Sequence, residues 1–155
     1  MKRILIISDT HGDINDCVKI IEKTKPDMII HAGDIIRDAD DLISIYPDIP
    51  MHCVCGNNDF SKRYPYNLLL SVDGKNIFIT HGHEYCVKYE SSLSTLEKKA
   101  REMDADLCVF GHTHTPLCAV RGTLIMLNPG STRFSGTYAI CEIENGKMKT
   151  CILDV

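Results

Sequence analysis

Short apolar runs alternate with amphipathic stretches along the first half of the chain. Runs of this kind predict buried strands, here at Arg3–Ser8, Asp27–His31 and Met51–Cys55. Apolar positions at helical spacing predict a helix over Ile14–Lys23, capped by Asp13, and a short helix over residues 38–46 that stops before Pro47. This alternation of strand and helix is typical of a sheet with parallel strands at its centre.

The second half of the chain is richer in hairpin signals. Asp73-Gly74 lies between apolar runs at Leu68–Val72 and Asn76–Thr80, and this dipeptide favours a tight turn. One more helix is predicted over Ser91–Met103, with Ser94 or Ser91 near its start. Further strands are predicted at Leu107–Phe110, 117–121, 123–127, 137–143 and 147–153, with turns at Arg121-Gly122 and Asn145-Gly146. We therefore expect one layered α/β domain over residues 1–155, with antiparallel strands added to a parallel core.

Composition and charge narrow the class of protein. The 155 residues are 44% hydrophobic and 25% charged, as in an ordinary globular domain. With a net charge of −4 and no basic stripe, stable nucleic-acid binding is not expected. The first apolar run meets Asp9 too early for a signal sequence or a membrane span, so we expect a cytoplasmic protein with no membrane partner. The 8 cysteines form no CxxC pair, and we expect them to be reduced and mostly buried.

Side chains able to bind a metal ion follow five of the predicted strands. The segments are Asp9-Thr10-His11, Gly33-Asp34, Gly56-Asn57-Asn58-Asp59, His81-Gly82-His83 and Gly111-His112-Thr113-His114. In open α/β sheets, ligands bind beyond the carboxyl ends of the strands, so we expect these segments to meet. Carboxylate, imidazole and amide groups suit Mn²⁺, Fe²⁺, Zn²⁺, Ni²⁺ or Co²⁺ rather than Cu(I) or an iron–sulfur cluster.

In this order, the motifs DxH, GD, GNxD, HGH and GHTH resemble those of the calcineurin-like metallophosphoesterases. The small single-domain phosphodiesterases of bacteria and archaea are the most similar branch, and the resemblance runs from Ile4 to about Ser131. It implies a layered α/β/β/α fold in which two mixed β-sheets pack as a sandwich flanked by helices. It also implies two divalent ions per chain, with Mn²⁺ preferred and Ni²⁺, Co²⁺, Fe²⁺ or Zn²⁺ as alternatives. The implied ligands are Asp9, His11 and His114 for one ion, Asn57, His81 and His112 for the other, and Asp34 between the two.

The chemistry implied by the resemblance is hydrolysis of a small phosphodiester by in-line attack of a metal-bridging hydroxide. Two divalent ions outweigh the two negative charges of Asp9 and Asp34, and this excess acidifies a bound water and favours an anionic ester. The substrate itself is not named by the sequence. The alternative is a non-catalytic metal-binding scaffold, because a retromer subunit that resembles this family has such a role.

Asn58 stands where many members of the family carry a histidine. An amide donates a hydrogen bond but cannot act as a general acid. We therefore predict slow turnover of poor leaving groups and better turnover of aryl phosphodiesters. Asp59, by pairing with a ligand histidine or by shuttling a proton, and His83, by facing the leaving group, are two candidates that could replace the missing acid.

Other polar residues are assigned more ordinary roles. The resemblance favours His81 over His83 as the ligand, whereas His31 and His52 are expected to be structural. Three basic residues are chemically able to bind phosphate, although a solvated surface position is preferred for each: Lys62, Arg63 and Arg133. Four tyrosines either line a substrate groove or pack on the fold: Tyr64, Tyr66, Tyr85 and Tyr89. A homodimer or homotetramer is left open.

Overall fold

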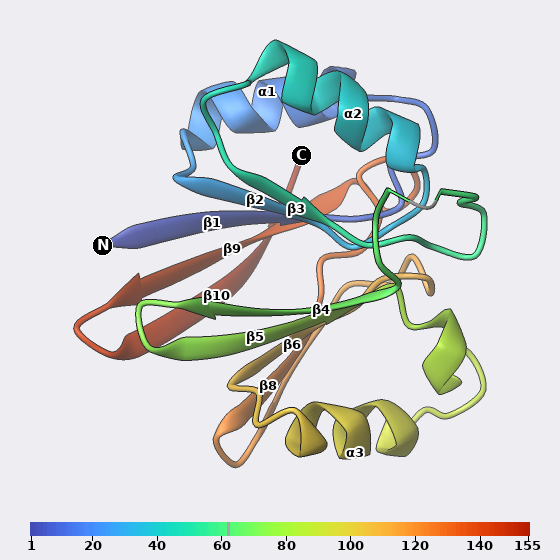
Figure 1. Cartoon of the computed structure of the whole chain (residues 1–155), viewed down its shortest axis with the longest axis vertical. Coiled ribbons are helices and arrows are strands. Elements are labelled where there is room, and N and C mark those ends of the chain that lie inside the picture. Colours follow the sequence, from blue (N-terminus) through green and yellow to red (C-terminus); the bar gives the residue numbers. More distant parts are fainter. Residues whose placement is uncertain (62) are drawn as a thin grey trace.

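A computed structural model describes residues 1–61 and 63–155 of the chain. The strands form two five-stranded sheets, with the orders β10-β9-β1-β2-β3 and β4-β5-β6-β8-β7. Helices α1 and α2 cover the outer face of the first sheet, and α3 covers the outer face of the second (Figure 1). This arrangement confirms the predicted α/β/β/α sandwich of two mixed sheets.

The elements follow one another in an order close to the predicted one. Their bounds are β1 (Lys2–Ile7), α1 (Asn15–Thr24), β2 (Met28–His31), α2 (Ile36–Ile45), β3 (Met51–Cys53), β4 (Asn67–Val72), β5 (Lys75–Thr80), the 3₁₀ turn η1 (His83–Tyr85), α3 (Ser94–Glu102), β6 (Leu107–Val109), β7 (Leu117–Arg121), β8 (Leu124–Asn128), β9 (Thr137–Glu144) and β10 (Lys147–Asp154). In the described part of the chain, no helix has both the length and the apolar character needed to cross a bilayer.

Strand β1 shows why the central strands are apolar along their whole length. It pairs in parallel with β2 and antiparallel to β9. Ile4 and Ile6 point into the core between the two sheets, whereas Leu5 and Ile7 pack under α1 and α2. Since both faces of the strand are buried, both sets of alternating side chains must be apolar.

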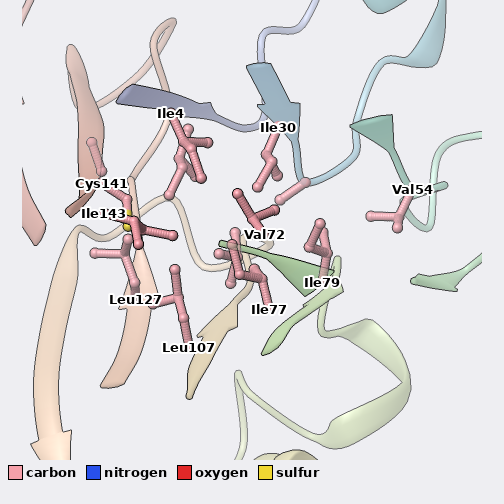
Figure 2. Packing of buried hydrophobic residues seen from close by; sticks show 14 residues of the cluster. Ile4, Ile30, Val54, Val72, Ile77, Ile79, Leu107, Leu127, Cys141 and Ile143 are labelled. Atoms are coloured by element: carbon pink, nitrogen blue, oxygen red, sulfur yellow. The ribbon is translucent and has the colours of Figure 1, made fainter. Parts of the chain in front are cut away.

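The core between the sheets is built from both of them. Figure 2 shows Ile4 and Ile30 of the first sheet opposite Val72, Ile77 and Leu127 of the second. Separate clusters fill the space under α1 and α2 and the space under α3. Three cores between four layers hold both sheets rigid, so the loops at the strand ends start from fixed positions.

Several boundaries differ from the predicted ones. Helix α1 is capped by Ile14 without a side-chain bond; Asp13 lies one residue earlier and accepts a hydrogen bond from the backbone N–H of Asn15 at 3.1 Å. Strand β3 ends at Cys53, and the buried Cys55 instead donates its N–H to the carbonyl of Pro65 at 2.8 Å. Helix α3 begins at Ser94, one of the two predicted starts, so the first three residues of the predicted range Ser91–Met103 are not helical. The turn η1 is not predicted.

The cysteines are as expected. All eight lie in the described part of the chain and are free, and five are buried: Cys17, Cys53, Cys55, Cys108 and Cys141. The exposed ones are Cys86, Cys118 and Cys151. Burial raises the pKa of Cys17 to about 12, so this thiol stays protonated at neutral pH.

Candidate metal centre

The strand-end segments meet at the carboxyl ends of the parallel strands of both sheets. Asp9 follows β1, Asp34 follows β2, His81 follows β5, and His112 and His114 follow β6. Five of the seven predicted ligands have a left-handed backbone, with φ between 47° and 71°: Asp9, His11, Asp34, His112 and His114. Non-glycine residues rarely adopt this conformation, and such residues concentrate where a site fixes the backbone.

One group of three candidate ligands centres on Asp9. Oδ1 of Asp9 lies 3.2 Å from Nε2 of His114 and 3.7 Å from Nε2 of His11. The other oxygen, Oδ2, accepts hydrogen bonds from the hydroxyl of Ser8 at 2.6 Å and from the backbone N–H of His112 at 3.1 Å. Because Oδ2 is held by two donors, Oδ1 is aimed at the imidazoles.

A second group centres on the fully buried His81. Its Nδ1 lies 2.8 Å from the carbonyl oxygen of Ala32, and a carbonyl only accepts, so Nδ1 carries a proton. In the neutral ring, Nε2 then presents a lone pair, 3.1 Å from Oδ1 of Asn57 and 3.5 Å from Oδ2 of Asp34. A backbone carbonyl behind an imidazole is the usual support of a metal-binding histidine.

Three polar atoms between these side chains would each be satisfied by a cation. Within residues 1–61 and 63–155, Oδ1 of Asp9 and Nε2 of His11 are buried without a hydrogen-bond partner. Nε2 of His81 offers its lone pair 3.8 Å from the same oxygen of Asp9. Buried polar atoms without a hydrogen-bond partner have lost their solvation, and a positive ion would satisfy the carboxylate oxygen and the ring nitrogens together. The residues present therefore fit a divalent metal.

The two groups share Asp9. Candidate ligand atoms lie within 4.8 Å of one another in the set Asp9, His11 and His114 and in the set Asp9, Asp34 and His81. The resemblance assigns the bridging position to Asp34, which belongs here to the second set only. The bridging role of Asp34 stays a prediction.

His112 and His83 complete the cluster of imidazoles. The ring centroid of His112 lies 5.0 Å from that of His81, and the centroid of His83 lies 5.6 Å from that of His81. Burial, followed by the neighbouring His81, lowers the pKa of His112 to about 4. Burial likewise lowers the pKa of His83, whose buried Nδ1 has no hydrogen-bond partner among the described residues. Both rings are therefore neutral near pH 7.

Two glycines let backbone pass close to the candidate ligands. A Cβ added to Gly56 would lie 1.9 Å from Oδ1 of Asp34, and one added to Gly111 would lie 2.7 Å from Oδ2 of Asp9. Neither position tolerates a side chain without moving a carboxylate. The glycines in the GNxD and GHTH motifs are thus required by space.

Asn58 and Asp59, the two predicted catalytic residues, are both engaged within the site. Asn58 donates from Nδ2 to Oδ2 of Asp34 at 2.8 Å. The carboxylate of Asp59 is buried and accepts the backbone N–H groups of Asp34, Ile36 and Gly56 at 3.0, 2.8 and 2.7 Å. Asp59 thus ties the loop after β3 to the loop after β2. We treat it as a positioning residue, and its predicted proton shuttle has no supporting contact here.

A buried hydrogen-bond chain that sequence reasoning missed links two ligand-bearing loops. Gly33 donates its N–H to Nδ1 of His31 at 3.1 Å, so the neutral ring carries its proton on Nε2. Nε2 lies 3.2 Å from the hydroxyl of Thr10, which in turn donates to Asp38. Asp38 also accepts the N–H of Gly12 at 2.7 Å. The structural role expected for His31 therefore includes holding the loops of Asp34 and Asp9 together.

The basic residues and tyrosines considered as substrate-binding candidates are not among the metal-binding side chains. Arg63 and Tyr64 both contact Asp40 of α2, at 3.2 and 2.5 Å, and Lys62 lies outside the described residues. Arg133 pairs with Asp13 at 3.7 Å. Tyr85 packs against the core under α3, Tyr89 is 89% exposed, and Tyr66 lies with its ring centroid 5.8 Å from that of His83.

Known proteins are similar to this chain in sequence and in fold. A probable metallophosphoesterase of Bacillus subtilis, YsnB, is 34% identical over 150 residues, which cover 92% of this chain and 85% of that protein. The phosphodiesterase MJ0936 of Methanocaldococcus jannaschii is 25% identical, over 98% and 99% of the two chains. The crystal structure of a predicted phosphoesterase from Streptococcus pneumoniae superposes with a TM-score of 0.82 at 30% identity, covering 99% of this chain and 89% of that one. The model of the calcineurin-like phosphoesterase superfamily domain matches residues 1–146, and the chain belongs to this superfamily.

Proposed function

We propose that this protein is a phosphodiesterase that depends on two divalent metal ions. The observation that carries the proposal is that oxygens of Asn57, Asp34 and Asp9 lie 3.1, 3.5 and 3.8 Å from Nε2 of the buried His81. Membership of a phosphoesterase superfamily agrees with it, as does a relative named as a phosphodiesterase.

The candidate ligands and their hydrogen-bond partners have different roles in this proposal. Asp9, His11 and His114 would hold one ion, Asn57, His81 and His112 would hold the other, and Asp34 is the candidate ligand that both would share. When bound, two divalent ions would supply an acidified water as nucleophile and positive charge for the phosphoryl oxygens. Ser8 and Ala32 orient Asp9 and His81 through the hydrogen bonds described above. Preorganised ligands of this kind keep the site from rearranging as charge builds in the reaction.

The charge of the ligand set favours diesters over monoesters. Only Asp9 and Asp34 contribute negative charge, while the amide and the neutral imidazoles contribute none. The centre therefore stays positive when it is loaded, which suits a monoanionic diester. Since Asn58 provides no proton, leaving groups that depart without protonation are the best substrates.

The test is hydrolysis of bis-p-nitrophenyl phosphate beside p-nitrophenyl phosphate. Metal-stripped protein receives Mn²⁺, Ni²⁺, Co²⁺, Fe²⁺, Zn²⁺ or Mg²⁺ in turn, with bound metal counted in parallel. Metal-dependent turnover of the diester, lost in Asp34→Asn and His81→Ala, supports the proposal. Asp41→Asn, an exposed aspartate of α2, and His52→Asn, a histidine of β3, are the matched controls and keep the activity.

The scaffold alternative predicts a different result in the same experiment. Two ions bind per chain, yet no diester is turned over with any of them. That outcome would remove the enzymatic proposal and leave metal binding in place.

A further inference from the structure

An exposed phenylalanine lies directly against the candidate metal centre. The side chain of Phe134 is 60% exposed, although a phenylalanine gains stability when it is buried. Its ring stacks on that of His114, with centroids 4.9 Å apart and planes 19° from parallel. The ring centroid of His11 lies 5.0 Å from that of Phe134. Phe134 therefore covers part of the first ligand group while most of its surface stays open.

The position of Phe134 is fixed by hydrogen bonds to the hydroxyl of the buried Ser131. The hydroxyl of Ser131 accepts the N–H groups of Phe134 and Arg133 at 2.9 and 3.1 Å. The same hydroxyl donates to the carbonyl of Asp9 at 2.7 Å, and Ser131 is fully buried. The turn that carries the ring is thus tied to the backbone of a candidate ligand. Its placement beside the centre is built into the fold.

A second exposed ring borders the other ligand group. Tyr66 is 46% exposed, and its ring centroid lies 5.8 Å from that of His83, which neighbours His81 and His112. The centre thus has aromatic surface at both of its ligand groups, and among the described residues no lysine or arginine forms an ion pair with Asp9 or Asp34. Such a border favours a planar apolar substituent over a highly charged one.

From this geometry we infer that Phe134 is a specificity-determining residue, which stacks on a planar aromatic group in the part of the substrate that stays on phosphorus when the leaving group departs. The inference rests on the proposed function, because it names the substrate class of the same site. An aryl group and a nucleobase share this chemistry, since every planar ring offers a face for stacking.

The experiment compares three diesters that release the same p-nitrophenolate. They are p-nitrophenyl methyl phosphate, bis-p-nitrophenyl phosphate and thymidine 5′-(p-nitrophenyl phosphate). Because the leaving group is constant, its pKa cannot produce a difference between wild type and a variant. The three differ only in the ester group that stays on phosphorus, which is methyl, p-nitrophenyl or thymidine. We expect Phe134→Ala and Phe134→Leu to lower kcat/KM for the two diesters whose retained group carries a ring about tenfold relative to the methyl diester, which is about 1.4 kcal/mol. Phe134→Tyr keeps the ring and restores the ratio to within about twofold of wild type.

The p-nitrophenyl and thymidine esters distinguish an aryl group from a nucleobase as the ring that Phe134 recognises. A loss confined to the diphenyl ester assigns an aryl substrate, and a loss confined to the thymidine ester assigns a nucleoside substrate. An unchanged ratio for both in Phe134→Ala, with two ions still bound, overturns the inference and leaves Phe134 as a cover for His114.

A binding measurement keeps the inference apart from the proposed function. If wild-type protein hydrolyses none of the three diesters, the proposed function fails. Calorimetric titration of the metal-loaded protein with phenylphosphonate and with methylphosphonate then decides. Tighter binding of the phenyl compound that is lost in Phe134→Ala supports stacking at Phe134. Equal binding of the two compounds by wild type contradicts it.

Discussion

Asn58 donates from its side-chain amide to Oδ2 of Asp34 at 2.8 Å, and its backbone N–H donates to Oδ1 of the same carboxylate at 3.2 Å. One residue thus holds both oxygens of the aspartate that we place between the two ions. The position at which the resemblance implies a histidine is used here to orient a candidate ligand. It supplies no proton to a leaving group.

Replacing Asn58 with histidine should restore that proton. We expect Asn58→His to raise turnover of a diester with an alkyl leaving group by up to about 10²-fold, because an alkoxide needs protonation. The gain with p-nitrophenolate should be much smaller. The measurement is kcat for a dinucleotide and for bis-p-nitrophenyl phosphate, with Asn58→Gln as the control that offers no acid. Equal gains on both substrates would argue against a general acid at this position.

Removing the carboxylate of Asp59 should cost stability. In Asp59→Ala the buried N–H groups of Asp34, Ile36 and Gly56 lose their acceptor, and leaving such groups unpaired costs about 1–3 kcal/mol each at most. We expect a lower free energy of unfolding in urea together with weaker metal binding, and no change in Asp41→Ala. A pH–rate profile that loses one limb while stability stays the same would instead identify Asp59 as a proton shuttle.

Gly56→Ala should disturb both the metal site and the local fold. The new Cβ would lie 1.9 Å from Oδ1 of Asp34 and 2.8 Å from the backbone nitrogen of Asp34, so the carboxylate must move. We expect fewer ions bound per chain together with a lower melting temperature, since the backbone of Asp34 must move as well. Gly146→Asn, in the turn between β9 and β10, is the control, because asparagine tolerates its left-handed backbone. Full metal binding by Gly56→Ala would show that the loop yields easily.

The buried His31 should make the protein less stable in mild acid. Burial lowers the pKa of His31, so the unfolded chain binds a proton, near the ordinary pKa of about 6.5, that the folded chain refuses. Stability from this group is therefore present above pH 6.5 and is lost as the pH falls, with a slope of at most about 1.4 kcal/mol per pH unit. Urea unfolding of metal-free protein at several pH values measures it. His31→Gln should flatten the slope, and an unchanged slope would assign the effect to other groups.

Much of the fold could be read from the sequence because the central strands are buried on both faces. Leu5 and Ile7 must be as apolar as Ile4 and Ile6, and such runs stand out along a chain. The candidate ligands were also readable, since each follows a strand and parallel strands share one carboxyl edge.

Contacts between distant positions could not be read in the same way. Thr10 contacts His31 and Asp38, which lie 21 and 28 residues away along the chain. No local sequence pattern marks hydrogen bonds that form only when these distant residues meet in the folded state. The same is true of Phe134, whose neighbours His11 and His114 come from other loops. The left-handed backbone of the ligand residues likewise follows from the assembled site.

Counting the ions bound by metal-stripped protein tests the central claim most directly. Calorimetric titration of wild type and of Asp9→Asn with Mn²⁺, with bound metal counted after dialysis, gives the number of sites and their affinities. We expect two ions per chain in wild type and weakened binding of both in Asp9→Asn, since Oδ1 of Asp9 belongs to both ligand groups. No saturable binding by wild type, or two ions held equally tightly by Asp9→Asn, would contradict a metal centre built around these residues.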